Sequence, residues 1–195
     1  SYYVAAYFAV IKAGGVVIPL NYQLAPREVA YIIKDSHMKF LITQVKLPLA
    51  DVLTELNYPN IEQLTYEDMR QPVNHELINY RQKEEDNCTI IYTSGTTGKP
   101  KGAMLSHKNL VANTIDFMAV VKMYPTDINL CVLPMYHCFA WTVSVSGPLY
   151  TGSCVVVQST YIFKDIMRVI KEQNINTFVG VPTMMQLFYE KATVE

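Results

Sequence analysis

The sequence has few of the features that define several large classes of protein. Its four cysteines (Cys88, Cys131, Cys138 and Cys154) show no C-x-x-C spacing, which argues against a zinc site or a disulfide framework and favours buried, reduced thiols. Its 16 lysines and arginines nearly balance its 17 aspartates and glutamates. No basic stripe accompanies aromatic residues, so nucleic acid is not an expected partner. Carboxylates at metal-binding spacing are also missing. We therefore expect a small-molecule partner and no metal ligated by the protein.

Long apolar runs are missing as well. No run approaches the roughly 18 residues that a membrane-spanning helix requires. The nearest candidate, residues 4–20, is interrupted by Lys12, Gly14, Gly15 and Pro19, and the start shows no signal-peptide pattern. We expect no integral membrane segment, and reduced thiols favour a cytoplasmic location.

What the chain does contain is an alternation of helix and strand patterns. Helices are expected over residues 2–12, 26–36, 107–121, 139–149 and 163–171, with a closing helix that begins at a Thr183–Gln186 capping box. Strands are expected over residues 16–20, 40–43, 89–92, 103–106, 128–133, 154–157 and 177–181. This rhythm predicts an α/β fold with mostly parallel sheets flanked by helices.

Two helices have apolar faces that predict their orientation. In the second helix the expected inward residues are Val29, Ala30, Ile32 and Ile33. In the helix over residues 107–121 they are Leu110, Val111, Thr114, Phe117, Met118 and Val121. The pattern loosens between residues 44 and 86, and the mixed charges of residues 81–86 indicate a solvated connection.

The most informative segment is residues 92–102, Tyr-Thr-Ser-Gly-Thr-Thr-Gly-Lys-Pro-Lys-Gly, which lies between two expected strands. Beyond its tyrosine it has four hydroxyls, three glycines and two lysines but no core-forming side chain. Gly95, Gly98 and Gly102 permit left-handed or strained dihedrals, so backbone N–H groups can converge on one anion. The hydroxyls can donate and the lysines supply charge, which predicts a phosphate-binding loop.

The Walker A loop of NTPases does not fit this segment. That loop needs four residues between its glycines and a following helix, whereas two residues separate Gly95 from Gly98 and Lys99 precedes Pro100. From the residues alone, a solvated hairpin loop remains the alternative.

The same segment, continued through Ala103-Met104-Leu105-Ser106-His107, resembles the phosphate-loop signature of the AMP-forming acyl-CoA synthetase, luciferase and peptide-synthetase adenylation superfamily. The resemblance implies that MgATP is bound and that the magnesium is carried by the nucleotide phosphates. It assigns phosphate binding to the loop hydroxyls and glycine amides, and charge neutralisation to the lysines. The residues concerned are Thr93, Ser94, Gly95, Thr96, Thr97, Gly98, Lys99 and Lys101.

A second segment, Pro134-Met135-Tyr136-His137-Cys138-Phe139, resembles the part of this family that borders the acyl pocket. By this resemblance Tyr136 and His137 gate and polarise the substrate carboxylate, and Trp141, Val181 and Pro182 line or flank the acyl tunnel. With Thr96 and Lys101, His137 completes the implied catalytic set. Without the resemblance, His137 is interpreted as a core histidine.

The lack of acidic residues after the expected strand over residues 128–133 bears on the class of substrate. Relatives that activate amino acids place an aspartate after the strand that ends near residue 133, because a buried ammonium group must be paired. Here no acidic residue lies between Asp127 and Asp165, which favours a fatty, short-chain or aryl acid, with coenzyme A as acceptor. A peptide-synthetase adenylation domain, a luciferase-like enzyme and a non-catalytic nucleotide-binding module remain as alternatives.

The resemblance covers nearly the whole chain and implies a fragment of the family's large N-terminal domain. Residues 1–86 are expected in a first α/β subdomain and residues 87–195 in the phosphate-loop subdomain. The family's adenine-contacting segment, ribose-binding aspartate and C-terminal domain are not in the sequence, so the fragment alone is expected to be inactive. Unpaired strand edges make homo-oligomerisation a further expectation.

Overall fold

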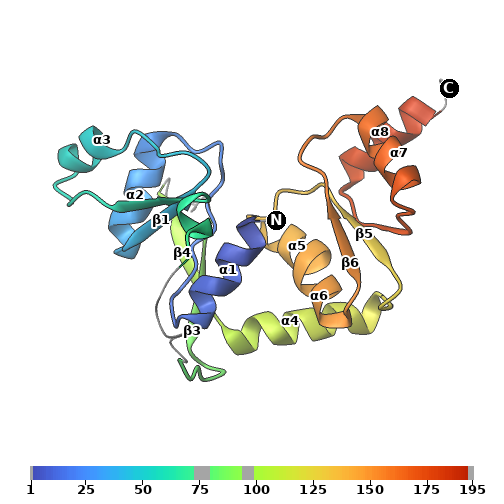
Figure 1. Ribbon diagram of the computed structural model, residues 1–195, viewed down its shortest axis with the longest axis horizontal. Coiled ribbons are helices and arrows are strands. Elements are labelled where there is room, and N and C mark those ends of the chain that lie inside the picture. Colours follow the sequence, from blue (N-terminus) through green and yellow to red (C-terminus); the bar gives the residue numbers. More distant parts are fainter. Residues whose placement is uncertain (1, 73–79, 94–98, 193–195) are drawn as a thin grey trace. The chain divides into compact units, whose positions relative to one another are not determined.

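The computed structural model describes residues 2–72, 80–93 and 99–192. Its contacts divide the chain into two compact units, Ser1–His107 and Lys108–Glu195. Each unit combines helices with strands (Figure 1), as the α/β prediction requires. The division follows residue 107, whereas the expected subdomain boundary lies between residues 86 and 87.

Helix α2 (Pro26–Ser36) is the central helix of the first unit. Pro26 has the fixed backbone angle that suits a first helical turn, and the Glu28 carboxylate accepts a hydrogen bond from the Ala25 N–H at 2.8 Å. The helix ends at Ser36, and the next residue, His37, adopts the left-handed conformation at φ 52°. Val29, Ala30, Ile32 and Ile33 are all buried, as their spacing predicts.

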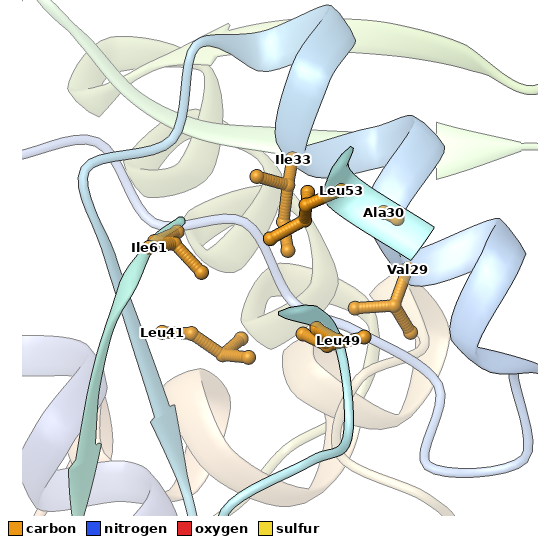
Figure 2. Packing of buried hydrophobic residues seen from close by; sticks show 7 residues of the cluster. All are labelled: Val29, Ala30, Ile33, Leu41, Leu49, Leu53 and Ile61. Atoms are coloured by element: carbon orange, nitrogen blue, oxygen red, sulfur yellow. The ribbon is translucent and has the colours of Figure 1, made fainter. Parts of the chain in front are cut away.

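A hydrophobic cluster packs this helix against a parallel strand pair. Strand β1 (Phe40–Thr43) pairs with β2 (Glu62–Thr65), and helix α3 (Ala50–Glu55) lies in the connection between them. A short 3-10 turn, η1 (Asp68–Arg70), follows β2. Figure 2 shows side chains from α2, β1 and the α3 region converging; the cluster comprises Val29, Ala30, Ile33, Leu41, Leu49, Leu53 and Ile61.

The antiparallel hairpin of β3 (Asn87–Thr93) and β4 (Lys101–Ser106) belongs to the first unit. Val17 forms an isolated bridge with Thr89, its N–H donating to the Cys88 carbonyl at 2.8 Å. The Tyr7 hydroxyl of α1 (Tyr2–Lys12) lies 2.5 Å from the Thr89 hydroxyl. These contacts join the hairpin to the N-terminal part of the first unit.

The second unit contains a parallel sheet with strand order β6-β5-β7. The strands are β5 (Ile128–Cys131), β6 (Cys154–Val157) and β7 (Thr177–Phe178). Buried Asn129 of β5 donates to the Ser153 hydroxyl at 2.9 Å and to the Cys154 carbonyl at 3.2 Å. This side chain therefore fixes the start of β6 beside β5.

Helices pack around this sheet (Figure 1). They are α4 (His107–Val120), α5 (Cys138–Trp141), α6 (Gly147–Thr151), α7 (Phe163–Glu172) and α8 (Pro182–Ala192), with a π-helical turn, η2 (Thr142–Ser146), between α5 and α6. Phe188 of α8 contacts the rings of Tyr161, Phe163 and Phe178, which attaches α8 to β7.

Several local expectations are wrong. Residues 16–20 form only the parallel bridge between Val17 and Thr89, on the edge of β3 that does not pair with β4, and no strand. Val111 is 53% exposed on α4 and does not point inward. Helix α8 begins at Pro182, so Thr183 lies inside the helix and cannot cap it. Of the four cysteines only Cys88 and Cys131 are buried.

Other differences concern extent. Strand β5 stops at Cys131 and β7 at Phe178, short of the expected ends at residues 133 and 181. Helix α3 and strand β2 form where the sequence pattern loosens between residues 44 and 86. No helix in the described part of the chain has the length and apolar character needed to cross a membrane.

The cluster predicts a large effect of one substitution. Replacing fully buried Ile33 with alanine leaves a cavity among α2, β1 and α3, and we expect it to lower the free energy of unfolding by about 2–5 kcal/mol. Urea denaturation measures this loss. Lys39→Ala, at an exposed position, is the control and should change stability by less than about 0.5 kcal/mol. Equal effects of the two variants would refute the packing assignment.

Candidate functional site

Strands β3 and β4 bring the two ends of the expected phosphate loop together (Figure 1). In their register Thr93 pairs with Lys101 and Tyr92 with Gly102. The Lys99 and Lys101 side chains are exposed and the Thr93 side chain is also exposed. Two cations and a hydroxyl at the closed end of a hairpin can attract and orient an anion.

The centre of the loop lies outside the described residues. It comprises Ser94, Gly95, Thr96, Thr97 and Gly98, and the role of each in phosphate binding stays a prediction. What the structure describes is the frame of this loop, from Thr93 on one strand to Lys99, Pro100 and Lys101 on the other.

Gly102 is important in this frame because it has no Cβ atom. It lies within β4 and has no positive φ, so it does not use the left-handed conformation that glycine permits. A Cβ atom built on it would lie 2.7 Å from Ile90 Cγ2 and 3.1 Å from Tyr92 Cζ. The hydrogen atom of glycine therefore leaves room for the Tyr92 ring beside β4.

Two residues of α2 contact the frame, and the sequence pattern did not indicate them. The Tyr92 hydroxyl donates to Asp35 Oδ2 at 2.6 Å, and the Tyr31 hydroxyl donates to the Pro100 carbonyl at 3.4 Å. Burial raises the pKa of the Tyr92 phenol above its ordinary value, and the neighbouring Asp35 carboxylate raises it further. The phenol is therefore a stable donor at neutral pH.

In the second unit, the expected acyl-site residues follow the carboxyl ends of adjacent parallel strands. Tyr136 and His137 come after β5, whereas Val181 and Pro182 come after β7. Strands β5 and β7 are hydrogen-bonded neighbours, so both segments lie at the sheet edge where open α/β sheets bind ligands. The structure thus brings these four residues to one edge.

The two residues at the end of β5 have different environments. The Tyr136 ring is half-buried, the His137 side chain is exposed, and their ring centroids lie 4.5 Å apart. The His137 carbonyl accepts a hydrogen bond from the Trp141 N–H at 2.9 Å at the start of α5. Trp141 itself is only 7% exposed, so its described environment is that of a packed residue, and its role at the acyl tunnel stays a prediction.

A hollow of about 770 Å³ lies elsewhere in the first unit, at the carboxyl ends of β1 and β2. Its side chains contact one another: the Arg70 guanidinium lies 4.7 Å from the centroid of the Tyr2 ring, which stacks on Tyr66 at 5.3 Å. These contacts engage the Arg70 guanidinium and the Tyr2 and Tyr66 rings, and we assign the hollow no ligand.

Protein ligands for a metal do not gather in the described ranges, where no three His, Cys, Asp or Glu side chains come together. That a magnesium ion is carried by the nucleotide phosphates, whose oxygens are ligands that magnesium prefers, stays a prediction.

Comparison with known proteins identifies the chain. The family model described as "AMP-binding enzyme" matches residues 2–195. The chain therefore belongs to the AMP-binding enzyme family.

Its relatives include ligases that act on different acids. A 4-hydroxybutyrate–CoA ligase of Metallosphaera sedula is 29% identical over 93% of this chain, and a feruloyl-CoA synthase of Amycolatopsis is 28% identical over 94%. Tyrocidine synthase 3 of Brevibacillus parabrevis is 30% identical over 97% of this chain but only 3% of its own length. The chain spans about 37% of the length of the two CoA ligases.

Solved structures share the fold. O-succinylbenzoate coenzyme A synthetase from Bacillus subtilis, in complex with ATP and a magnesium ion, aligns with a TM-score of 0.84 at 23% identity over 97% of this chain and 39% of that chain. ATP-bound MatB from Rhodopseudomonas palustris aligns with a TM-score of 0.76 at 26% identity over 94% of this chain and 37% of that chain. These likenesses establish the α/β fold.

The close approach at Gly102 leads to a second prediction. We expect Gly102→Ala to lower the free energy of unfolding by about 1–3 kcal/mol, because the new methyl group overlaps Ile90 and the Tyr92 ring. Urea denaturation of Gly102→Ala in the wild-type and Ile90→Ala backgrounds checks the cause. The cost should be smaller where Ile90 is already truncated, and an equal cost in both backgrounds would contradict the steric explanation.

Proposed function

We propose that this chain is the phosphate-binding and acyl-binding part of an ATP-dependent acyl-CoA ligase. The observation that carries the proposal is the β3–β4 hairpin, whose register brings Thr93 and Lys101 together at the ends of a threonine- and glycine-rich loop. Membership of the AMP-binding enzyme family supports it. The CoA ligases among the relatives support the reaction class.

In the first half-reaction a carboxylate oxygen attacks the α-phosphorus of ATP. The bond from that phosphorus to the bridging oxygen breaks, and acyl-AMP and pyrophosphate form. In this proposal Thr93, Ser94, Thr96, Thr97 and the glycine amides bind the β- and γ-phosphates. Lys99 and Lys101 offset the charge that develops on pyrophosphate. Preorganised dipoles and cations perform this step without a proton transfer.

The carboxylic acid binds, in the same proposal, at the sheet edge of the second unit. His137 donates a hydrogen bond to the carboxylate, and Tyr136 borders the acyl group together with Val181 and Pro182. The exposure of His137 and its position after the carboxyl end of β5 support this assignment.

The two acidic residues that flank this stretch of sequence, Asp127 and Asp165, support a substrate without an α-amino group. Asp127 precedes β5, at the end of the strand opposite to His137, and its carboxylate accepts hydrogen bonds from the Tyr124 N–H and the Asn176 amide. Asp165 forms an ion pair with Arg168 at 3.2 Å. Neither carboxylate is placed to pair with a substrate ammonium group, which favours fatty or aryl acids.

In the second half-reaction the thiol of coenzyme A attacks the acyl carbonyl carbon, the bond to AMP breaks, and a thioester forms. The synthetase names among the relatives support coenzyme A as the acceptor.

Pyrophosphate exchange on the full-length protein tests the first half-reaction. With a panel of fatty, aryl and amino acids, we expect exchange with a fatty or aryl acid. Replacing both Thr96 and Thr97 with alanine should lower the exchange rate by about 10²-fold or more, because the loop loses donors to the phosphates. Thr126→Ala, at an exposed position away from both expected sites, is the matched control. Failure of every acid to support exchange would refute the proposed function.

His137 has its own test in the same assay. We expect His137→Ala to raise the KM for the acid about tenfold, the factor that corresponds to losing one hydrogen bond of about 1.4 kcal/mol. The KM for MgATP should be unchanged, because the proposed phosphate loop lies on other residues. An increase confined to the KM for MgATP would contradict the assignment of His137.

Amino-acid adenylation is a second candidate, favoured by the 30% identity to tyrocidine synthase 3. The acid panel separates the two. Exchange supported by amino acids alone would replace the acyl-CoA ligase proposal with this one.

A further inference from the structure

Helix α2 contacts both strands that lead into the phosphate loop. On the incoming strand β3, the Tyr92 hydroxyl donates to the Asp35 carboxylate at 2.6 Å. On the outgoing side, the Pro100 carbonyl accepts from the Tyr31 hydroxyl at 3.4 Å. Tyr92 is separated from the loop centre by Thr93, and Pro100 by Lys99.

The two contacts come from one face of the helix. Tyr31 and Asp35 are four positions apart, so their side chains lie one above the other on α2. The opposite face carries Val29, Ala30 and Ile33 into the hydrophobic cluster. The helix therefore connects the loop frame to the packed core of the first unit, which is a rigid support for a binding loop.

The residue that faces Tyr92 on β4 leaves room for the Tyr92–Asp35 contact, which is the shorter of the two. Gly102, opposite Tyr92 in the register, leaves the space that the Tyr92 ring needs beside β4. A hydrogen bond from a phenol to a carboxylate is also shorter and stronger than a neutral one, in agreement with its 2.6 Å length.

We propose that Asp35 and Tyr31 of α2 are positioning residues, which hold Tyr92 and Pro100 and thereby orient the adjacent Thr93 and Lys99 toward the phosphates of ATP. This inference rests on the proposed function. It assigns α2 an indirect role in nucleotide binding, because neither residue touches the nucleotide.

A role in stability alone makes a different prediction. If Asp35 and Tyr92 served only to attach the hairpin, their substitution would lower the unfolding temperature while the KM values for both substrates stayed the same. If they orient the loop, the KM for MgATP rises and the KM for the carboxylic acid does not. The split between the two KM values is therefore the readout.

The experiment uses pyrophosphate exchange and thermal unfolding of the full-length protein. We expect Asp35→Ala and Tyr92→Phe each to lower kcat/KM for MgATP about tenfold, mainly through KM, because each removes the same hydrogen bond. The double variant should lose no more than either single variant. Asp35→Asn retains an acceptor oxygen and should restore most of the activity. Tyr31→Phe should show a smaller effect, since its hydrogen bond is longer.

Glu62→Ala and Tyr124→Phe are the controls, which likewise remove a carboxylate and a phenol hydroxyl at exposed positions away from the loop frame. Wild-type exchange with unchanged KM for MgATP in Asp35→Ala and Tyr92→Phe would overturn this inference and leave the proposed function intact. Additive losses in the double variant would also overturn it. Absence of exchange in the wild-type protein would refute the proposed function itself, and with it the positioning role.

Discussion

The first unit depends on the burial of one face of α2. Val29, Ala30 and Ile33 pack against Leu41, Leu49, Leu53 and Ile61, and this contact attaches the β1–β2 pair to the helix. Each fully buried aliphatic side chain contributes on the order of 1.5–3 kcal/mol. Because these residues fix the helix in place, its other face can present Tyr31 and Asp35 to the hairpin at defined positions. Core packing and the contacts to the loop frame therefore come from the same eleven-residue helix.

The second unit is organised around its parallel sheet. Its parallel strands β5, β6 and β7 end at one edge, so residues that are far apart in the chain, such as His137 and Pro182, are brought to that edge. Parallel pairing also requires long connections, which the helices between the strands supply. Asn129 and Asn176 fix the start of the sheet through hydrogen bonds to Ser153 and to the Ile128 N–H. The edge with the expected acyl residues is thus set by the backbone of the sheet.

Much of the local structure could be predicted from the sequence. The bounds of α1 and α2, the strands β1 and β6, and the inward face of α2 agree with the patterns, because periodicity, Pro26 and the Gly14–Gly15 pair act within a few residues. Strand β2 and helix α3 could not be predicted in this way. Each is short, and β2 has one strongly apolar residue, so its pairing with β1 is what makes it a strand. The exposure of Val111 and Cys154 likewise depends on neighbours that no local pattern specifies.

The candidate site also has a part that could be predicted from the sequence and a part that could not. The sequence by itself predicted a phosphate-binding loop, because one short segment combines hydroxyls, glycines and lysines, which is the chemistry that a bound anion requires. It also placed the chain in its family, as the match over residues 2–195 confirms. Only the tertiary structure decided which residues contact the loop frame: Asp35 and Tyr92 are 57 positions apart, and Tyr31 and Pro100 are 69 apart. Such contacts arise from the packing of α2 against the hairpin, and no periodicity or spacing in the chain encodes them.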